Sequence, residues 1–218
     1  MVKKPEDKKT GPLDVLLIGC GRASRDHVRA LTYLEKSGRL RLAGLVDRDL
    51  EAAKAIRASR KASLHQPLID QDLDQILLRH PFQLAVIATP PRTHASLAHK
   101  ALEAGLHLVV EKPLTLNVSE ARVLVDRAKA DDRILVTGFK WRYIPGVKGI
   151  QDLIAQGKLG PPLYGTVTTR WGHDQAYYDQ ADWFGTWAAE GGALMNQSIH
   201  ALDLMAWLMG ARPLEATA

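Results

Sequence analysis

The sequence predicts an α/β fold built on a doubly wound parallel sheet, and three observations carry this prediction. Short apolar runs, typical of strands buried on both faces, alternate with helical patterns of about a dozen residues up to position 136. The first run, 13–18, leads directly into Gly19-Cys20-Gly21 and then into a helical pattern. Beyond about residue 140 the alternation stops, which indicates a second domain.

The first part of the chain contains the strands and helices of the predicted sheet. Pro90 and Pro91 end one strand, since proline cannot continue a central strand. Gly105 ends one helix and Asn117 caps another. The stretch 63–70 is ambiguous. We expect strands at 13–18, 40–46, 84–88, 106–110 and 134–136, and helices from Ser24 through Leu34 and at 50–60, 72–78, 93–104 and 117–130.

The second part of the chain has a different pattern. Residues 163–171 alternate like a strand with one wet face, and 213–218 begin to alternate in the same way. Residues 147–156 have helical spacing, and a loop follows at 172–190. After Gly191-Gly192 comes a strongly apolar helix that reaches Met209, and we expect it to be buried.

Composition excludes several classes of protein. The 218 residues fit one large domain, or one domain and part of another, and no apolar run approaches the roughly 18 residues of a membrane span. The net charge of +5 comes from scattered basic residues without a nucleic-acid motif, so nucleic acid is not an expected partner. The single cysteine indicates a reducing, cytoplasmic location. Residues 1–12 form a charged tail without the apolar core of a signal peptide.

The glycine turn after the first strand has the context of a dinucleotide-binding fingerprint. Gly19 would allow the tight turn, and Gly21 would let the backbone approach a pyrophosphate at the helix N-terminus. Ser24 stands where a third glycine is usual; it is small, and its hydroxyl could bind phosphate. Arg22 and Arg25 lie beside this phosphate site. A glycine-rich turn without a ligand is the alternative.

Asp47 ends the second strand, 23 residues after Ser24, close to the spacing expected for the acid that binds the adenosine ribose. A carboxylate there repels a 2′-phosphate and therefore favours NAD over NADP. Arg48 leaves NADP open, because a neighbouring arginine can accommodate that phosphate. Asp47 could alternatively cap the next helix.

Two further segments could carry chemistry. Lys112 follows a buried strand and could reach into the cofactor cleft, or could form a surface ion pair with Glu111. Asn196, His200 and Asp203 are spaced i, i+4, i+7, so they form one polar stripe on an apolar helix. Such a stripe lines a site or a polar network, and histidine is a natural general base; a core histidine held by Asp203 is the alternative. We expect no metal site, since the HExxH motif is absent.

Five motifs follow one another along the chain. They are Gly19-x-Gly21-Arg22-x-x-x-x-His27, Ala88-Thr89-Pro90-x-x-x-His94, Glu111-Lys112-Pro113, Gly138-Phe139-x-x-Arg142-Tyr143-x-Pro145 and Gly191-Gly192-Ala193-Leu194-x-Asn196-x-x-Ile199-His200-x-x-Asp203. Together these motifs resemble the glucose–fructose oxidoreductase/inositol dehydrogenase/rhizopine catabolism (GFO/IDH/MocA) family of nicotinamide-dependent oxidoreductases. The resemblance covers about residues 13 to 215.

The resemblance implies a Rossmann domain at 13–140 followed by an α+β substrate-binding domain, incomplete here, at 141–218. That second domain carries a sugar pocket and often an oligomer interface, so we expect a homo-oligomer at full length. Two glycines precede Ala193 where three are common. Family members are longer, so we expect this chain to be a fragment or an early-terminated product.

The resemblance also implies residue roles. Lys112 matches the catalytic lysine and His200 the catalytic histidine, with Asp203 supporting His200. Asn196 stands where many members have aspartate; it would orient the substrate and favours the branch that oxidises C3 of nucleotide-linked amino sugars. The expected cofactor-binding residues are Gly19, Gly21, Arg22, Ala23, Ser24, Asp47, Thr89, Pro90, His94, Glu111, Lys112 and Arg142.

The expected activity is hydride transfer between NAD and a secondary alcohol of a sugar, nucleotide sugar or cyclitol. Two alternatives remain open. One is an NAD-dependent glycoside hydrolase of the same fold, and the other is a non-catalytic nucleotide-binding fragment.

Overall fold

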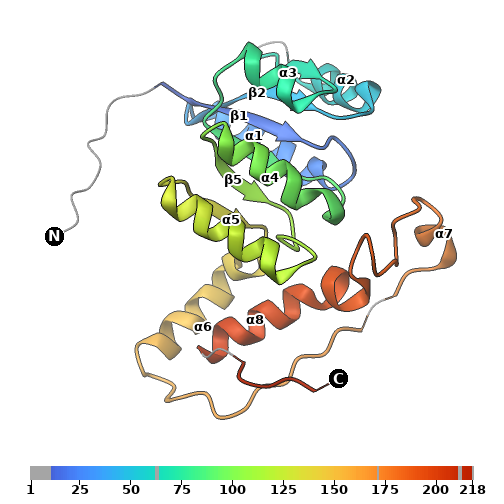
Figure 1. Cartoon of the computed structure of the whole chain (residues 1–218). Helices are drawn as coiled ribbons and strands as arrows, with labels where there is room; N and C mark the ends of the chain where they lie inside the picture. Colours follow the sequence, from blue (N-terminus) through green and yellow to red (C-terminus); the bar gives the residue numbers. More distant parts are fainter. Residues whose placement is uncertain (1–10, 62–63, 171, 211–212, 218) are drawn as a thin grey trace.

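The computed structural model describes residues 11–217, apart from 62–63, 171 and 211–212, so most of the tail expected over 1–12 lies outside the described residues. Its centre is a six-stranded parallel sheet of order β3-β2-β1-β4-β5-β6 (Figure 1). The chain begins in the middle of this sheet and winds outward in both directions, which confirms the doubly wound prediction. The strands are β1 Leu13–Ile18, β2 Leu40–Val46, β3 Leu68–Asp70, β4 Leu84–Ile87, β5 His107–Val110 and β6 Leu135–Thr137.

Helices cover both faces of the sheet (Figure 1). Side chains alternate along β1, so Leu16 and Ile18 pack with α3, α4 and α5, while Val15 and Leu17 pack with α1 and α2. Both faces of the sheet are therefore shielded from water, in agreement with the continuous apolar sequences of its strands. The helices are α1 Ser24–Lys36, α2 Leu50–Ser59, α3 Leu73–Arg79, α4 His94–Glu103 and α5 Val118–Ala130, with a 3-10 turn, η1, at Pro91–Thr93.

Side-chain caps begin several of these helices. Asn117 accepts a hydrogen bond from the Ser119 N–H at 2.8 Å, which confirms the predicted start of α5. Asp49, not Asp47, caps α2, so the capping alternative for Asp47 is wrong. The ambiguous stretch at 63–70 contains the short strand β3, and its first residue lies outside the described ones.

The second part of the chain is helical and irregular. In Figure 1, α8 runs beside α6, and the two helices are in contact. Within the predicted loop 172–190, Asp174 caps a short helix, α7. The elements are η2 Lys140–Tyr143, α6 Pro145–Ala155, α7 Gln175–Tyr178, the π-helical turn η3 Leu194–Ser198 and α8 Ile199–Met209.

Two strand predictions in this part are wrong. Residues 163–170 and 213–217 are irregular, whereas Trp171 and Ala218 lie outside the described residues. A strand needs a hydrogen-bonded neighbour to satisfy its backbone, and no described segment pairs with either stretch. Leu163 and Tyr164 are accordingly 90% and 83% exposed.

The expected buried helix after Gly192 is also only partly correct. It begins with the π-helical turn η3, and in α8 only His200 and Ala201 are buried. The other apolar side chains are half-buried or exposed because the described neighbours, α6 and η2, cover one side of α8. Within the described residues, no helix combines the length and apolarity needed to cross a membrane.

Candidate active site

The turn after β1 meets the end of β4 at the carboxyl edge of the sheet. Gly19 has φ of +94°, and its N–H donates to Val46 O at 2.8 Å. A Cβ at this position would lie 2.6 Å from the carbonyl oxygen of Ala88, so only glycine fits. At Gly21, by contrast, a Cβ would meet no atom within 4 Å, so a ligand can approach the backbone there.

The N-terminus of α1 follows this turn. Ala23 is the N-cap residue and supplies no side-chain hydrogen bond, so no side chain closes the helix start to an anion, although the N–H groups of Ser24 and Arg25 also donate to Gly21 O at 3.2 Å and Arg22 O at 3.3 Å. Ser24 is fully buried, and its hydroxyl donates to Gly21 O at 2.6 Å. Its hydroxyl therefore braces the turn and does not face a phosphate, contrary to our expectation. The open helix start and the glycine cradle together fit a dinucleotide pyrophosphate.

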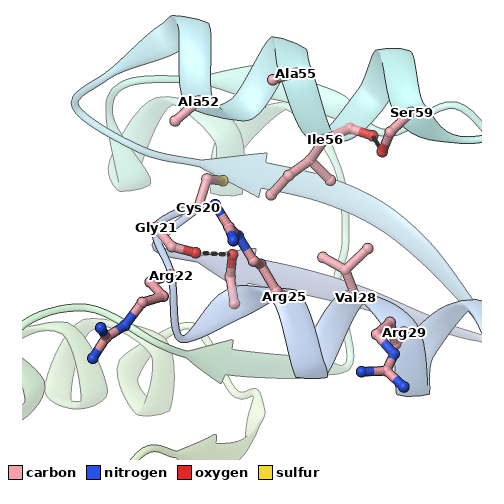
Figure 2. Close-up of a pocket in the computed structure, with 11 residues that line it drawn as sticks. Cys20, Gly21, Arg22, Arg25, Val28, Arg29, Ala52, Ala55, Ile56 and Ser59 are labelled. Atoms are coloured by element: carbon pink, nitrogen blue, oxygen red, sulfur yellow. Dashed lines mark hydrogen bonds between the residues drawn. The ribbon is translucent and has the colours of Figure 1, made fainter.

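A groove of about 490 Å³ lies between α1 and α2, beside the glycine turn (Figure 2). Figure 2 shows Arg25 directed toward Cys20 and α2, while Arg22 extends to the opposite side. The groove shares Gly21, Arg22 and Ser24 with the glycine turn of the carboxyl-edge site, whereas neither Asp47 nor Lys112 lines it. Arg22 instead lies over the Tyr177 ring, 5.1 Å from its centroid, and so contacts the second part of the chain.

Asp47 lies at the end of β2, as expected, and faces the glycine turn. One carboxylate oxygen accepts from the Cys20 N–H at 2.6 Å, and the other accepts from the Asp49 N–H at 2.9 Å. Burial, together with the charges of Asp47 and Asp49, raises the pKa of the Cys20 thiol to about 12. Cys20 is therefore uncharged near neutral pH and is not a nucleophile.

The turn after β4 is held by His94. Its ring is fully buried, with Nδ1 2.7 Å from Pro113 O and Nε2 2.9 Å from Thr89 O. Burial lowers the pKa of His94, although these two carbonyls oppose the shift. Because both ring nitrogens contact backbone, His94 links the turns after β4 and β5 and does not offer a group to a cofactor. Pro90 caps η1.

Glu111 follows β5 and pairs with His27 of α1. The His27 Nε2 and Glu111 Oε1 atoms are 2.8 Å apart. Burial disfavours the Glu111 carboxylate, but the contact with His27 and the charges of His27 and Lys112 outweigh burial and hold the pKa of Glu111 below its usual value. The pair connects the helix of the glycine turn to the residue before Lys112.

Lys112 meets Asn196, which lies 84 residues later in the chain. Its ammonium donates to both the backbone oxygen and Oδ1 of Asn196, each at 2.7 Å. Burial lowers the pKa of Lys112, and Lys140 and Arg22 add to this, while Glu111 and Glu190 oppose it. The structure thus brings together two residues of the predicted catalytic set.

His200 is buried against aromatic side chains. Its ring stacks on Trp141, with centroids 5.5 Å apart and planes inclined by 22°, and meets the edge of Phe139. Nδ1 is buried without a hydrogen-bond partner in the described part of the chain. Burial and the positive charges of Lys112 and Lys140 lower the pKa of His200, so the imidazole is neutral near pH 7 and can accept a proton.

Asp203 and Arg142 are paired with each other, which differs from our expectation for Asp203. Arg142 donates to the Asp203 carboxylate through Nε at 2.7 Å and Nη2 at 2.5 Å. The guanidinium also lies over the Phe139 and Trp207 rings. Asp203 therefore does not hold the His200 ring. Arg142 ties η2 to α8, and its role in cofactor binding stays a prediction.

Sequence reasoning missed three residues of this region: Glu190, Trp141 and Tyr177. Glu190 is only 2% exposed and accepts from the Asn196 amide and from the Gly185 N–H. A single acid directly before a double glycine is the signal that could have identified it. The aromatic partners of His200 and Arg22 carry no comparable local signal.

The described residues contain no group of three or more histidine, cysteine or acidic side chains that could hold a metal ion. The arrangement instead offers an amine, an amide and a neutral imidazole. These groups can hold an alcohol oxygen and accept its proton.

The fold and its carboxyl edge define a dinucleotide-binding α/β protein. Residues 13–139 match the model of the oxidoreductase family with an NAD-binding Rossmann fold, and residues 147–218 match the GFO/IDH/MocA C-terminal domain. The chain belongs to the GFO/IDH/MocA oxidoreductase family. The match confirms the predicted fold and NAD as the cofactor of the first domain.

Some of the similar proteins are named as dehydrogenases of a cyclitol or of a nucleotide sugar. The chain is 28% identical to scyllo-inositol 2-dehydrogenase (NAD(+)) of Bacillus subtilis, covering 89% of this chain and 53% of the relative. It is 27% identical to UDP-N-acetylglucosamine 3-dehydrogenase of Acidithiobacillus ferrooxidans, with coverage of 93% and 56%. The crystal structure of the WlbA dehydrogenase from Bordetella pertussis, in complex with NADH and UDP-GlcNAcA, superposes with a TM-score of 0.82 at 30% identity, with coverage of 91% and 60%. The chain spans about half the length of the curated relatives it matches.

Proposed function

We propose that the chain belongs to an enzyme that transfers hydride between NAD and a secondary alcohol of a sugar, nucleotide sugar or cyclitol. The observation that carries this proposal is the meeting of Lys112 and Asn196 at the carboxyl edge of β5, with the buried His200 close enough for the Lys112 charge to affect its pKa. In this proposal, residues 13–140 bind the cofactor and residues 141–218 form part of the substrate domain.

Each group has a defined task in the proposed reaction. The Lys112 ammonium donates to the alcohol oxygen and stabilises negative charge that develops on it. The His200 imidazole accepts the hydroxyl proton as the C–H bond of the same carbon breaks, and Asn196 orients the substrate. NAD, when bound, supplies the acceptor for the hydride. The turn at Gly19 and Gly21, with the open start of α1, would hold its pyrophosphate, and Asp47 would hold the adenosine ribose.

For the substrate class, we favour a nucleotide-linked amino sugar. Asn196 supports this choice by the resemblance given above. The similarity to the Acidithiobacillus UDP-N-acetylglucosamine 3-dehydrogenase and to the Bordetella WlbA dehydrogenase in complex with UDP-GlcNAcA agrees with this choice, because both involve a UDP-linked N-acetylated sugar. We also propose a homo-oligomer for the full-length enzyme and, from the single buried cysteine, a cytoplasmic location.

His200→Ala tests the catalytic assignment. Loss of a general base should lower turnover by about 10²–10⁴-fold, while NAD affinity stays nearly unchanged. Turnover is followed as NADH formation with UDP-N-acetylglucosamine and myo-inositol, on this chain and on the longest form of the protein that its gene encodes. His99→Ala, on the half-buried side of α4, is the matched control.

The outcomes separate the alternatives. Full turnover in the folded fraction of His200→Ala would contradict the catalytic role. Glycoside cleavage without net NADH formation would favour the hydrolase, because its cofactor is reduced and reoxidised within one turnover. NAD binding without any turnover would favour a nucleotide-binding protein.

A further inference from the structure

We propose that Glu190 is a positioning residue of the candidate active site: its carboxylate fixes the orientation of the Asn196 amide and thereby holds the Lys112 ammonium in place. The effect on turnover rests on the proposed function. The contacts themselves do not, because they join three side chains of this chain.

Glu190 is a buried carboxylate with a donor on each oxygen. Oε2 accepts from the Gly185 N–H at 2.5 Å, and Oε1 accepts from Nδ2 of Asn196. The residue is 2% exposed. A buried charge is costly unless such partners compensate it, so a carboxylate at this place is a specific requirement and not a solvated surface group.

The hydrogen-bond polarity of the cluster requires an acceptor at position 190. The Lys112 ammonium can only donate, so the atom of Asn196 that it meets must be Oδ1. The Asn196 NH₂ group then faces Glu190, where the Gly185 N–H is already a second donor. The two donors approach the two different oxygens of this side chain, and a carboxylate is the group that accepts at both. A glutamine would offer one oxygen and one NH₂, and one of the two donors would lose its partner.

The backbone between Glu190 and Asn196 is built to bring them together. Gly191 and Gly192 have φ of +83° and +68°, a conformation that other residues rarely adopt. A Cβ at Gly191 would lie 2.6 Å from Cβ of Met195. The N–H groups of Glu190 and Gly191 both donate to Thr186 O, which closes the loop beneath the carboxylate. The position of Glu190 is therefore set by the fold.

The charge of Glu190 also acts on Lys112. Glu111 and Glu190 raise the pKa of Lys112, whereas burial, Lys140 and Arg22 lower it. The Lys112 charge in turn lowers the pKa of the neighbouring His200. Loss of the Glu190 charge should therefore make Lys112 easier to deprotonate and should weaken its hold on an alcohol oxygen.

A four-member variant cycle tests the proposal: the unmodified chain, Glu190→Gln, Asn196→Asp and the double variant. The readout is the pH dependence of Lys112 acetylation by acetic anhydride, resolved at this residue by mass spectrometry, with thermal unfolding measured on the same samples. This readout needs no turnover, so it stands even if the proposed activity fails.

The expected results follow from the polarity of the contacts. In Glu190→Gln the acetylation profile moves to lower pH by about one pH unit, because an opposite charge is lost. In Asn196→Asp two carboxylates meet, and the fold is destabilised. In the double variant the new amide at position 190 donates to the new carboxylate at position 196, which still accepts from Lys112. The profile should therefore return to that of the unmodified chain or move beyond it to higher pH.

The matched control is Glu103→Gln, an exposed acid at the end of α4, which should leave the profile unchanged. An unshifted profile in folded Glu190→Gln, or a double variant that behaves like Glu190→Gln, would overturn the proposal. If Glu190→Gln does not fold, Asn196→Ala is the second test. It removes the side chain that connects Glu190 to Lys112 but keeps the charges of both residues. An unchanged acetylation profile of Lys112 in this variant would contradict the positioning role.

With NAD and UDP-N-acetylglucosamine as probe, turnover of Glu190→Gln should fall about tenfold, the loss expected for one charge-assisted hydrogen bond. If the unmodified chain shows no turnover, the proposed function fails on its own, and the acetylation profiles still test Glu190.

Discussion

The sheet region, residues 13–137, and the region after residue 140 bury their apolar side chains to very different extents. Both core clusters consist of residues between Val15 and Ala128. In the second region the buried apolar residues of the described chain are Tyr177, Ala189 and Ala201, whereas Leu163, Trp187 and Leu214 are 78% to 100% exposed. The residues of both core clusters therefore find their partners within the first region, whereas few apolar side chains of the described second region are buried.

Two stretches with strand-like sequences make the difference concrete. Residues 40–46 form β2 because β1 and β3 bind its backbone on either side. Residues 163–170 have the alternation of apolar and polar residues that is typical of strands, yet no described segment pairs with them. Alternation sets which face is apolar, but a neighbour must satisfy the backbone before a strand forms.

The largest expected contrast is between two identical substitutions. Leu16→Ala, in the fully buried centre of β1, should lower the free energy of unfolding by about 2–5 kcal/mol. Leu163→Ala, at a 90% exposed position, should change it by less than about 0.5 kcal/mol. Urea unfolding of both variants measures this. Equal losses would mean that the second region is packed as tightly as the sheet.

A smaller effect is expected at the start of β1. Asp14 is buried and pairs with Arg41, at 2.5 and 2.6 Å, and with His80 at 2.6 Å. Burial opposes the Asp14 carboxylate, but Arg41 and His80 outweigh burial and lower its pKa. Asp14→Asn should lower the free energy of unfolding by about 2 kcal/mol. This loss is smaller than that expected for breaking a fully buried ion pair, because the Arg41 side chain is 40% exposed.

The lowered pKa of Asp14 also fixes the sign of its pH dependence. Its contribution to stability is fully present above the unfolded pKa of an aspartate, about 4, and is lost as pH falls through the lower folded pKa. Asp14→Asn should therefore reduce the acid sensitivity of the unfolding free energy. Asp26→Asn, in the exposed pair with Arg29, is the control and should change little. An unchanged acid profile in Asp14→Asn would refute this.

Cofactor binding should need only the self-sufficient first region, so this chain should bind NAD by itself. Asp47→Ser removes the charge that repels a 2′-phosphate and should shift the ratio of NAD to NADP affinity by about tenfold toward NADP. Titration of both cofactors by calorimetry measures the ratio. Asp49→Asn keeps the cap of α2 and should leave the ratio unchanged. Tighter binding of NADP by the unmodified chain would contradict the role of Asp47.

Substitutions in the second region should have the smallest effect on the free energy of unfolding but should clearly reduce self-association. Its exposed apolar side chains should make the chain self-associate. Leu163→Ser combined with Trp187→Ser should reduce the self-association seen by sedimentation and change the unfolding free energy by less than about 0.5 kcal/mol. If the unmodified chain were a monodisperse monomer, the exposed apolar side chains of the second region would not drive self-association, and the prediction would be wrong.

The sequence alone predicted the strands of the sheet other than β3, the glycine turn and the Asn117 cap, because the signal for each lies in residues that are neighbours in the chain. The apolar run of β1, the left-handed turn at Gly19 and the Asn117 cap are set by local periodicity, local backbone conformation and one short hydrogen bond. Asp47 belongs here too, since its spacing from Ser24 spans a single helix and strand.

Only the tertiary structure decided how the polar groups of the second region are paired. The contacts of Lys112 with Asn196 and of Arg142 with Asp203 join residues 84 and 61 positions apart, so they depend on how η3 meets the turn after β5 and on how α8 packs against η2. The stripe of Asn196, His200 and Asp203 was visible in the sequence, but its members take three different partners. A periodic pattern fixes which side chains share a face, whereas the partner of each one depends on the distant segment that packs against that face.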